Sequence, residues 1–322
     1  MPSGATMTCT DIGAFSAVFR SPSCEFTADS PDRFAARYSL LDFNRVGMLR
    51  ASENLARVAH FVIPDTHVAL SFQSRSGPSI RISGRELGAT QVGVHAPGGY
   101  VFQRLTGPST WGTVFLPADA LMDFGATAAS LEFLLSPFAL VATVPALALD
   151  RLRDLHAELA ALAETAPAVV ANPGTARGLE DALAERLLDC VDTPERSDVS
   201  PTRYRHTVTL RKLQELAEAY SDQPLFMLDL CSVLGTSRRR LQEICNEFFG
   251  MGPKRFLLLR RMHLVNRALR QADPAGASVT EIAMRYGFWE LGRFAVAYRR
   301  LFGEPPSKTL RRPAGSETSR PR

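Results

Sequence analysis

The first part of the chain is patterned in short apolar runs that turn residues interrupt. Between about residues 33 and 116, runs such as VALSF, IRI and VFQRL are short, and several alternate apolar with polar positions. Short alternating runs favour β-strands over helices. The segments SGPS, SGREL, APGG and TGPS between them are typical of turns. Several short strands at even spacing predict a small sandwich or barrel.

The rhythm becomes helical after Pro145. Leucines then recur at spacings of three, four and three residues, which places them in one stripe on a helix: Leu152, Leu155, Leu159 and Leu162. The segment APAVVANPG interrupts this pattern, and a second helix starts with Leu179 and ends near Cys190. We therefore predict a first domain over residues 1–195, with helices at 146–192. The leucine stripe has two interpretations, packing within the chain or a seam between two subunits.

A polar stretch with two prolines, DTPERSDVSPTR, is the best linker candidate, and we place the linker at residues 196–209. The sequence beyond it has the pattern of helices, which predicts an all-α domain over residues 210–312 and a disordered tail over 313–322. The fold class is thus α+β with two domains. The most apolar run, residues 131–149, contains Glu132 and two prolines, so we expect buried segments with a bend and no membrane span.

Two segments of the helical part share one spacing of small residues and glycine. Cys231 precedes Gly235 by four residues, and Ala283 precedes Gly287 by four residues. A small residue lets the following helix approach closely, and glycine supplies the positive φ that the turn between two helices demands. The pattern predicts two helix-turn-helix motifs about 52 residues apart, joined by a long basic helix.

The starts of the second helices differ between the two motifs. Ser237 lies where its hydroxyl caps the second helix of the first motif. Ser237 lies two residues after Gly235. Trp289 lies two residues after Gly287, but its side chain has no group that can cap a helix. Trp289 has two open interpretations, as a packing residue of the core or as a residue on the DNA side.

Helical periodicity turns a set of residues outward near the start of each second helix. A recognition helix touches base edges with such residues, and Arg fits guanine while Gln fits adenine. Gly292 would permit close approach of the helix to DNA, and arginines at the far end of a recognition helix suit phosphates. The candidate DNA-binding residues are Ser237, Arg238, Arg239, Gln242, Trp289, Leu291, Gly292, Arg293, Val296, Arg299 and Arg300.

The distribution of charge supports a polyanionic partner for the second domain. Residues 201–322 contain 22 Lys or Arg and 11 Asp or Glu, whereas residues 1–200 contain 15 bases and 22 acids. The net charge of +4 conceals this asymmetry. A basic half beside an acidic half indicates that the basic half meets a polyanion. Most of its bases are arginine, whose fork binds phosphates and guanine edges at two points.

The cysteines and histidines favour neither a disulfide framework nor a metal site. The five cysteines are widely spaced and form no CxxC pair, which is typical of a reducing compartment. His60, His67 and His95 could suggest a metal in the strand-rich part, but they form no HxH cluster, so structural roles are favoured. The N-terminus also lacks the pattern of a signal peptide. We expect a cytoplasmic protein with no cofactor and no metal.

The segments SRRRLQEICNEFFGMGPKRFLLLRRMHLVNRAL and VTEIAMRYGFWELGRFAVAYRRLFGEPPSKTL closely resemble the AraC/XylS transcription regulators. The resemblance covers roughly residues 210–312. It implies a seven-helix unit whose two motifs enter successive major grooves on one face of double-stranded DNA. It also implies a sequence-specific regulator, in most cases an activator that works with RNA polymerase, and not an enzyme. Cys231, where alanine is usual, and Glu243, where some relatives place a basic or polar contact, depart from the family pattern.

The first domain resembles the cupin-like sensor domains of such regulators more loosely. This likeness implies that the domain senses a small-molecule effector or a partner, and that the helices after Pro145 hold a homodimer together. Two other functions stay open: a DNA-repair alkyltransferase-type enzyme, or an architectural DNA binder with the same DNA module. The alkyltransferases use a four-cysteine zinc site, for which the first half has too few well-spaced cysteines. Cys9 or Cys24 would be the nucleophile of an enzyme.

Overall fold

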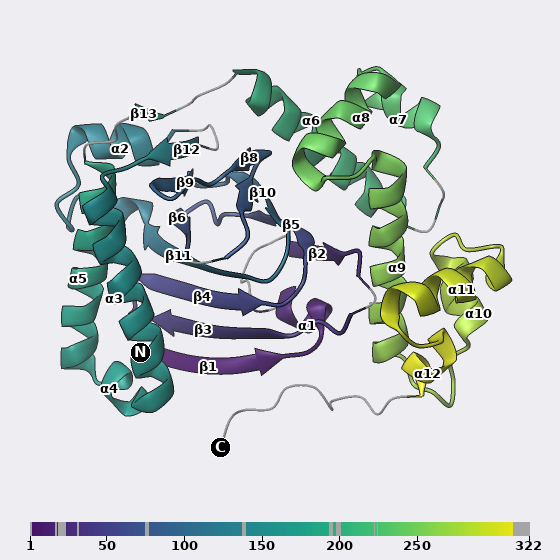
Figure 1. Ribbon diagram of the computed structural model, residues 1–322, viewed down its shortest axis with the longest axis horizontal. Coiled ribbons are helices and arrows are strands. Elements are labelled where there is room, and N and C mark those ends of the chain that lie inside the picture. Colours follow the sequence, from purple (N-terminus) through teal and green to yellow (C-terminus); the bar gives the residue numbers. More distant parts are fainter. Residues whose placement is uncertain are drawn as a thin grey trace.

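The computed structural model describes residues 2–16, 18, 24–30, 32–74, 77–136, 140–192, 196–197, 201–221, 223 and 225–311. A strand-rich part comes first and a helical part follows it (Figure 1). The α+β class and this order of parts are as the sequence predicts. The predicted tail at 313–322 lies outside the described residues, and the predicted division of the chain at 196–209 stays a prediction.

The strands in the described part of the chain form two antiparallel sheets. The larger sheet pairs its strands in the order β1 (Ser3–Cys9), β3 (Ala36–Asp42), β4 (Gly47–Glu53), β11 (Ser109–Pro117), β6 (His67–Gln73), β9 (Gln91–His95), β12 (Leu140–Thr143) and β13 (Arg196–Ser197). The smaller sheet has the order β2 (Cys24–Ala28), β5 (Arg57–Val62), β10 (Tyr100–Leu105), β7 (Ile80–Ile82) and β8 (Arg85–Glu86).

The two sheets pack face to face as a sandwich. Phe61 and Val101 of the smaller sheet share one buried cluster with Leu49 and Trp111 of the larger sheet. No ladder joins the two sheets among the described strands, so the closed cupin-like barrel, one of the two predicted forms, is not observed. One edge of the smaller sheet, β2, lies against helices α1 (Ile12–Ser16) and α9 (Pro253–Gln271) in place of a strand of the other sheet.

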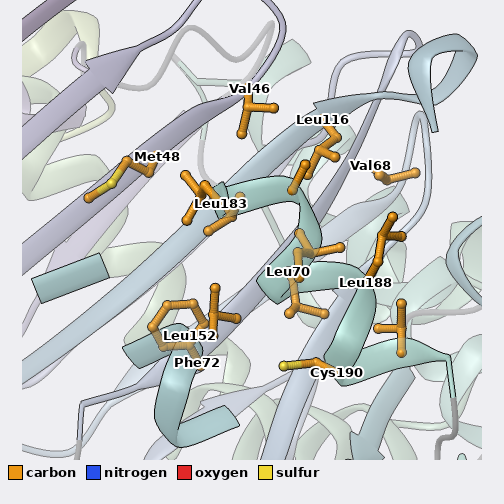
Figure 2. Packing of buried hydrophobic residues seen from close by; sticks show 14 of the residues in the cluster. Val46, Met48, Val68, Leu70, Phe72, Leu116, Leu152, Leu183, Leu188 and Cys190 are labelled. Atoms are coloured by element: carbon orange, nitrogen blue, oxygen red, sulfur yellow. The ribbon is translucent and has the colours of Figure 1, made fainter. Parts of the chain in front are cut away.

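A layer of helices covers the outer face of the larger sheet. Its members are the 3-10 turn η1 (Ala118–Ala120), α2 (Ala128–Leu134), α3 (Ala146–Thr165), α4 (Pro167–Ala171) and α5 (Pro173–Val191). Figure 2 shows Leu152 of α3 and Leu183 of α5 among Met48, Leu70 and Phe72 of the sheet. The predicted leucine stripe therefore packs within the chain. Removing this apolar area from water stabilises the layer by about 25 cal/mol per Å².

The C-terminal part consists of helices in two small bundles that α9 connects. Its helices are α6 (Pro201–Ala219), α7 (Met227–Val233), α8 (Arg238–Phe249), α9, α10 (Val279–Arg285), α11 (Leu291–Phe302) and α12 (Pro306–Leu310). Phe256 of α9 belongs to the core that α6, α7 and α8 form, and Val265 belongs to the core that α10, α11 and α12 form. None of the helices in the described ranges combines the length and hydrophobicity that a membrane span needs.

The two parts of the chain share a buried interface. Phe102, on the outer face of the smaller sheet, packs against Phe248 and Phe249 of α8, with ring centroids 5.9 and 5.5 Å apart. Figure 1 shows α6, α8 and α9 beside this sheet. The helical part is thus held against the sandwich by apolar side chains, with α9 along the contact.

Candidate nucleic-acid interface

The first predicted motif is the turn between α7 and α8. Gly235 has a φ of +60°, and the amide of Thr236 donates to the carbonyl of Cys231 at 3.0 Å. The hydroxyl of Ser237 accepts from the amide of Arg240 at 3.2 Å. The predicted glycine turn and the predicted Ser237 cap are therefore confirmed.

The second motif repeats this geometry between α10 and α11. Gly287 has a φ of +75°, and the amide of Phe288 donates to the carbonyl of Ala283 at 3.0 Å. Ala283 is fully buried, so a larger side chain would separate the two helices.

The turn of the second motif is one residue longer than that of the first. Gly235 stands two residues before the N-cap Ser237, whereas Gly287 stands three residues before the N-cap Glu290. The predicted equivalence of Trp289 with the capping serine is therefore wrong. Trp289 lies in the turn and is 64% exposed, which excludes its interpretation as a core residue.

The outward face of α8 is charged. Its buried stripe consists of Leu241, Ile244, Cys245, Phe248 and Phe249. A helix advances about 100° per residue, so Arg239 and Glu243 point directly away from that stripe. Arg239 Nε and Glu243 Oε1 are 3.0 Å apart, and Arg240 Nη1 and Glu243 Oε2 are 3.2 Å apart. These hydrogen bonds lower the pKa of Glu243, so the carboxylate stays ionised.

The outward face of α11 is small and apolar. Its buried stripe consists of Phe294, Tyr298 and Leu301, and Gly292 and Val296 point directly away from it. Val296 is 71% exposed. A Cβ atom at Gly292 would meet nothing within 4 Å, so the packing of the chain itself does not require glycine there.

The predicted residues lie on the surface. All of them except the half-buried Leu291 are exposed. Arg293 is paired with Glu290, with Nη1 and Oε2 2.6 Å apart, and this pair stands at the start of α11. Exposure makes these residues available to a partner, and their contact with DNA stays a prediction.

The arginines of α9 have another role, which the sequence did not indicate. Arg260 binds Glu25 of β2 through Nε and Nη2, each 2.6 Å from a carboxylate oxygen, and it is almost fully buried. Its Nη1 also donates to the carbonyl of Ala217 at 2.6 Å. Nearer the start of α9, the Nε of Arg255 donates to Asp29 at 2.9 Å. Part of the basic charge of the second half is therefore neutralised by acids of the first half.

Two histidines complete the contact between the parts. His60 of β5 is bonded to Gln214 of α6, and burial lowers its pKa to about 4. Nε2 of His263 in α9 lies 2.8 Å from the carbonyl oxygen and 3.1 Å from the amide nitrogen of Ala28, and burial lowers the pKa of this ring as well. Both rings are therefore neutral at pH 7, in agreement with a structural role.

The remaining candidates for metal or covalent chemistry are dispersed. His95 is bonded to Ser71 at 3.0 Å, and His67 to Thr66 at 2.8 Å. Across the described ranges no three His, Cys, Asp or Glu side chains gather as a possible metal site. Burial raises the pKa of Cys24 to about 12, so its thiol is protonated at neutral pH and is a poor nucleophile.

Comparisons with known proteins find relatives of the C-terminal helical part. A family model described as a helix-turn-helix domain matches residues 230–312. The chain is 36% identical over 133 residues to a probable thc operon regulatory protein of Rhodococcus erythropolis, with 40% of each chain covered. It is 41% identical over 75 residues to the XylDLEGF operon transcriptional activator of Pseudomonas putida, with 23% of each chain covered.

A solved structure of a probable AraC family transcriptional regulator from Rhodopseudomonas palustris CGA009 is also similar. The identity is 33%, the match covers 33% of this chain and 99% of that one, and the TM-score is 0.30. The matches to the two curated relatives named above cover 40% and 23% of those proteins, so the chain spans less than half the length of each. Over its C-terminal helical part, this chain is thus similar to helix-turn-helix transcription regulators.

Proposed function

We propose that the chain is a sequence-specific regulator of transcription that binds double-stranded DNA through α8 and α11. The observation that carries the proposal is the pair of glycine turns, which present two exposed helix faces from the two ends of α9. Recognition helices of helix-turn-helix proteins lie in the major groove and touch base edges with their first turns. The relative named as a transcriptional activator favours an activator. We expect such an activator to act with RNA polymerase.

The two helices would read two major-groove segments about one helical turn apart. A homodimer would read two copies of that unit, as a direct or an inverted repeat. We assign the two functions to the predicted domains: a cupin-like sensor over residues 1–195 and the DNA-binding module over residues 210–312.

The function is tested by selection of genomic DNA fragments with the purified full chain. We expect one enriched motif with two conserved segments, located upstream of genes. Equal binding of all fragments would instead identify an architectural binder. Bound zinc together with transfer of an alkyl group from damaged DNA would identify a repair enzyme.

Two arginines of α11 are expected to differ in what they contribute to DNA binding. Replacement of Arg293 by alanine should cost roughly 1–3 kcal/mol of binding free energy and relax the preference at one base position. Replacement of Arg300 by alanine should weaken binding to all DNA sequences alike and reduce the slope of log K against log salt by about one. Binding to a selected site and to random DNA, measured over a salt series, distinguishes the two. Unchanged binding by either variant would remove that residue from the interface.

We place the effector site at one end of the sandwich. A pocket of about 560 Å³ opens between β1, the β3–β4 hairpin, β5 and β11. Its lining is mostly apolar and includes Phe61, Trp111 and Phe115, with Thr113 as one of its polar residues. Small-molecule sites are typically concave and apolar with a few polar groups, and pockets of this size hold one small ligand.

Strand β5 connects this pocket with the DNA module. Successive residues of a strand point to opposite faces of the sheet. Phe61 lines the pocket, while its neighbour His60 is bonded to Gln214 of α6. An effector that displaced Phe61 would therefore act on the strand that holds the DNA module.

The effector site is tested by a thermal-shift screen of metabolites. A ligand that binds only the folded chain raises its apparent stability by about 2.7 kcal/mol at 100 times the Kd. We expect this shift to be lost when Ala5, which lines the pocket, is replaced by tryptophan. A hit that stabilises both proteins equally would place the effector elsewhere.

A further inference from the structure

Glu243 is a negative charge at the centre of a face that we propose meets DNA. It points directly away from the buried stripe of α8, and its side chain is 47% exposed. It stands six residues after the N-cap Ser237, and Val296 stands six residues after the N-cap Glu290. The same position of the two helices is thus a carboxylate in one and an apolar side chain in the other. A carboxylate is repelled by the DNA phosphates, so nearby groups must offset this repulsion if α8 binds DNA.

Two arginines make this carboxylate compatible with DNA. Arg239 and Arg240 each donate to one oxygen of Glu243, and the three side chains together keep a net positive charge. Each carboxylate oxygen has a second lone-pair site, so both oxygens remain able to accept a further hydrogen bond. Arg239 is 89% exposed beside them.

The chemistry of base edges then selects the partner of Glu243. An ionised carboxylate only accepts hydrogen bonds. In the major groove, cytosine presents an amino donor alone, adenine presents an amino donor beside the acceptor N7, and guanine and thymine present acceptors. The lone pair of adenine N7 would repel the carboxylate oxygens, so cytosine fits best. Resting on the proposed function of α8, we propose that Glu243 reads the amino group of a cytosine, with Arg239 free to donate to a neighbouring guanine.

The inference predicts a change of base when the carboxylate becomes an amide. Gln both donates and accepts and fits the N6 and N7 of adenine. We expect the wild-type chain to select cytosine at one position of the segment that α8 reads, and Glu243→Gln to select adenine or lose the preference there. Affinity for the wild-type site should fall about 10- to 100-fold. The measurement is selection from a randomised DNA library, followed by binding titrations.

A matched control is available on α6. Arg211 and Glu215 form the same exposed pair one helical turn apart, with Nε and Oε1 2.8 Å apart. Glu215→Gln removes an equal charge away from α8 and should leave every base preference unchanged. Equal melting temperatures of the three proteins exclude a folding effect.

The outcomes separate this inference from the proposed function. If Glu243→Gln selects the wild-type sequence at every position, or if the wild-type chain selects no cytosine in this segment, the role of Glu243 is overturned while sequence-specific binding stands. If the wild-type chain enriches no sequence at all, the proposed function itself fails, and the role of Glu243 fails with it.

Discussion

Replacement of Gly292 by glutamate should abolish sequence-specific DNA binding and leave the fold intact. Gly292 faces away from the core of α11, and a side chain there would meet nothing in the chain. A carboxylate in the first turn is favourable for the helix, because it complements the positive end of the helix dipole. On DNA, the same carboxylate would enter the groove beside the phosphates and hold α11 away from the bases. Affinity for the selected site should fall toward the non-specific level, on the order of 10³-fold.

The experiment has a matched control on α5, at the far side of the sandwich from α11 (Figure 1). Gly178 lies in α5 and is exposed, and a Cβ atom added to it would also meet nothing within 4 Å. Gly178→Glu should therefore leave the binding of one chain to a single unit of the site unchanged, and it should not lower stability, because glutamate is a better helix former than glycine. Titrations of the two variants against one selected site, with melting curves, give the comparison. Full affinity of Gly292→Glu would show that α11 does not enter a groove.

Replacement of Glu25 by alanine should destabilise the chain by about 3 kcal/mol, the second large effect that the structure predicts. Arg260 would stay nearly buried at the contact between the sandwich and α9, and only its bond to Ala217 would remain. Loss of one partner of a buried pair leaves an uncompensated charge, which costs more than the pair contributes. Urea unfolding measures the change in the free energy of unfolding.

A second ion pair at the same contact serves as its control. Asp29, which follows β2 directly, binds Arg255, but the two side chains are 33% and 63% exposed. Exposed pairs contribute about 0–1 kcal/mol, so Asp29→Ala should have a small effect. Equal losses from the two substitutions would contradict a buried, structural role of the Glu25–Arg260 pair.

The sequence was most informative where one residue type has a strict physical reason. Gly235 and Gly287 adopt positive φ, so glycine at these positions marked both turns. Helical periodicity predicted Arg239 on the outward face of α8, whereas Glu243, which also points directly away from the apolar stripe, was not among the predicted residues. Ser237 was recognisable as a cap because its hydroxyl follows the turn directly.

The features that the sequence did not reveal are of two kinds: a one-residue insertion in a turn, and contacts between residues far apart in the chain. One extra residue in the second turn moved the N-cap from Trp289 to Glu290, and residue spacing from Gly287 could not show that insertion. The pairing of Glu25 with Arg260 joins residues 235 positions apart, which no local pattern contains. The sequence alone does not distinguish the arginines of α9 that pair with acids of the sandwich from the arginines exposed on α8.

The strand-rich half was predicted in class but not in arrangement. Strand β6 is buried at five successive positions, because helices cover one face of the larger sheet and the smaller sheet covers the other. Such a strand has little alternation, so its face cannot be assigned from sequence. Whether two sheets close or stay open depends on which edges pair, and that is a property of the whole fold.

The proposed function requires α8 and α11 to occupy two successive major-groove segments of one DNA site. Chemical probing of guanine N7 in the complex with a selected site tests this requirement directly, because N7 lies in the major groove. We expect two protected segments whose centres lie about 10–10.5 base pairs apart on one face of the duplex. Protection of a single segment, or of no guanine N7 in a complex that still forms, would contradict it.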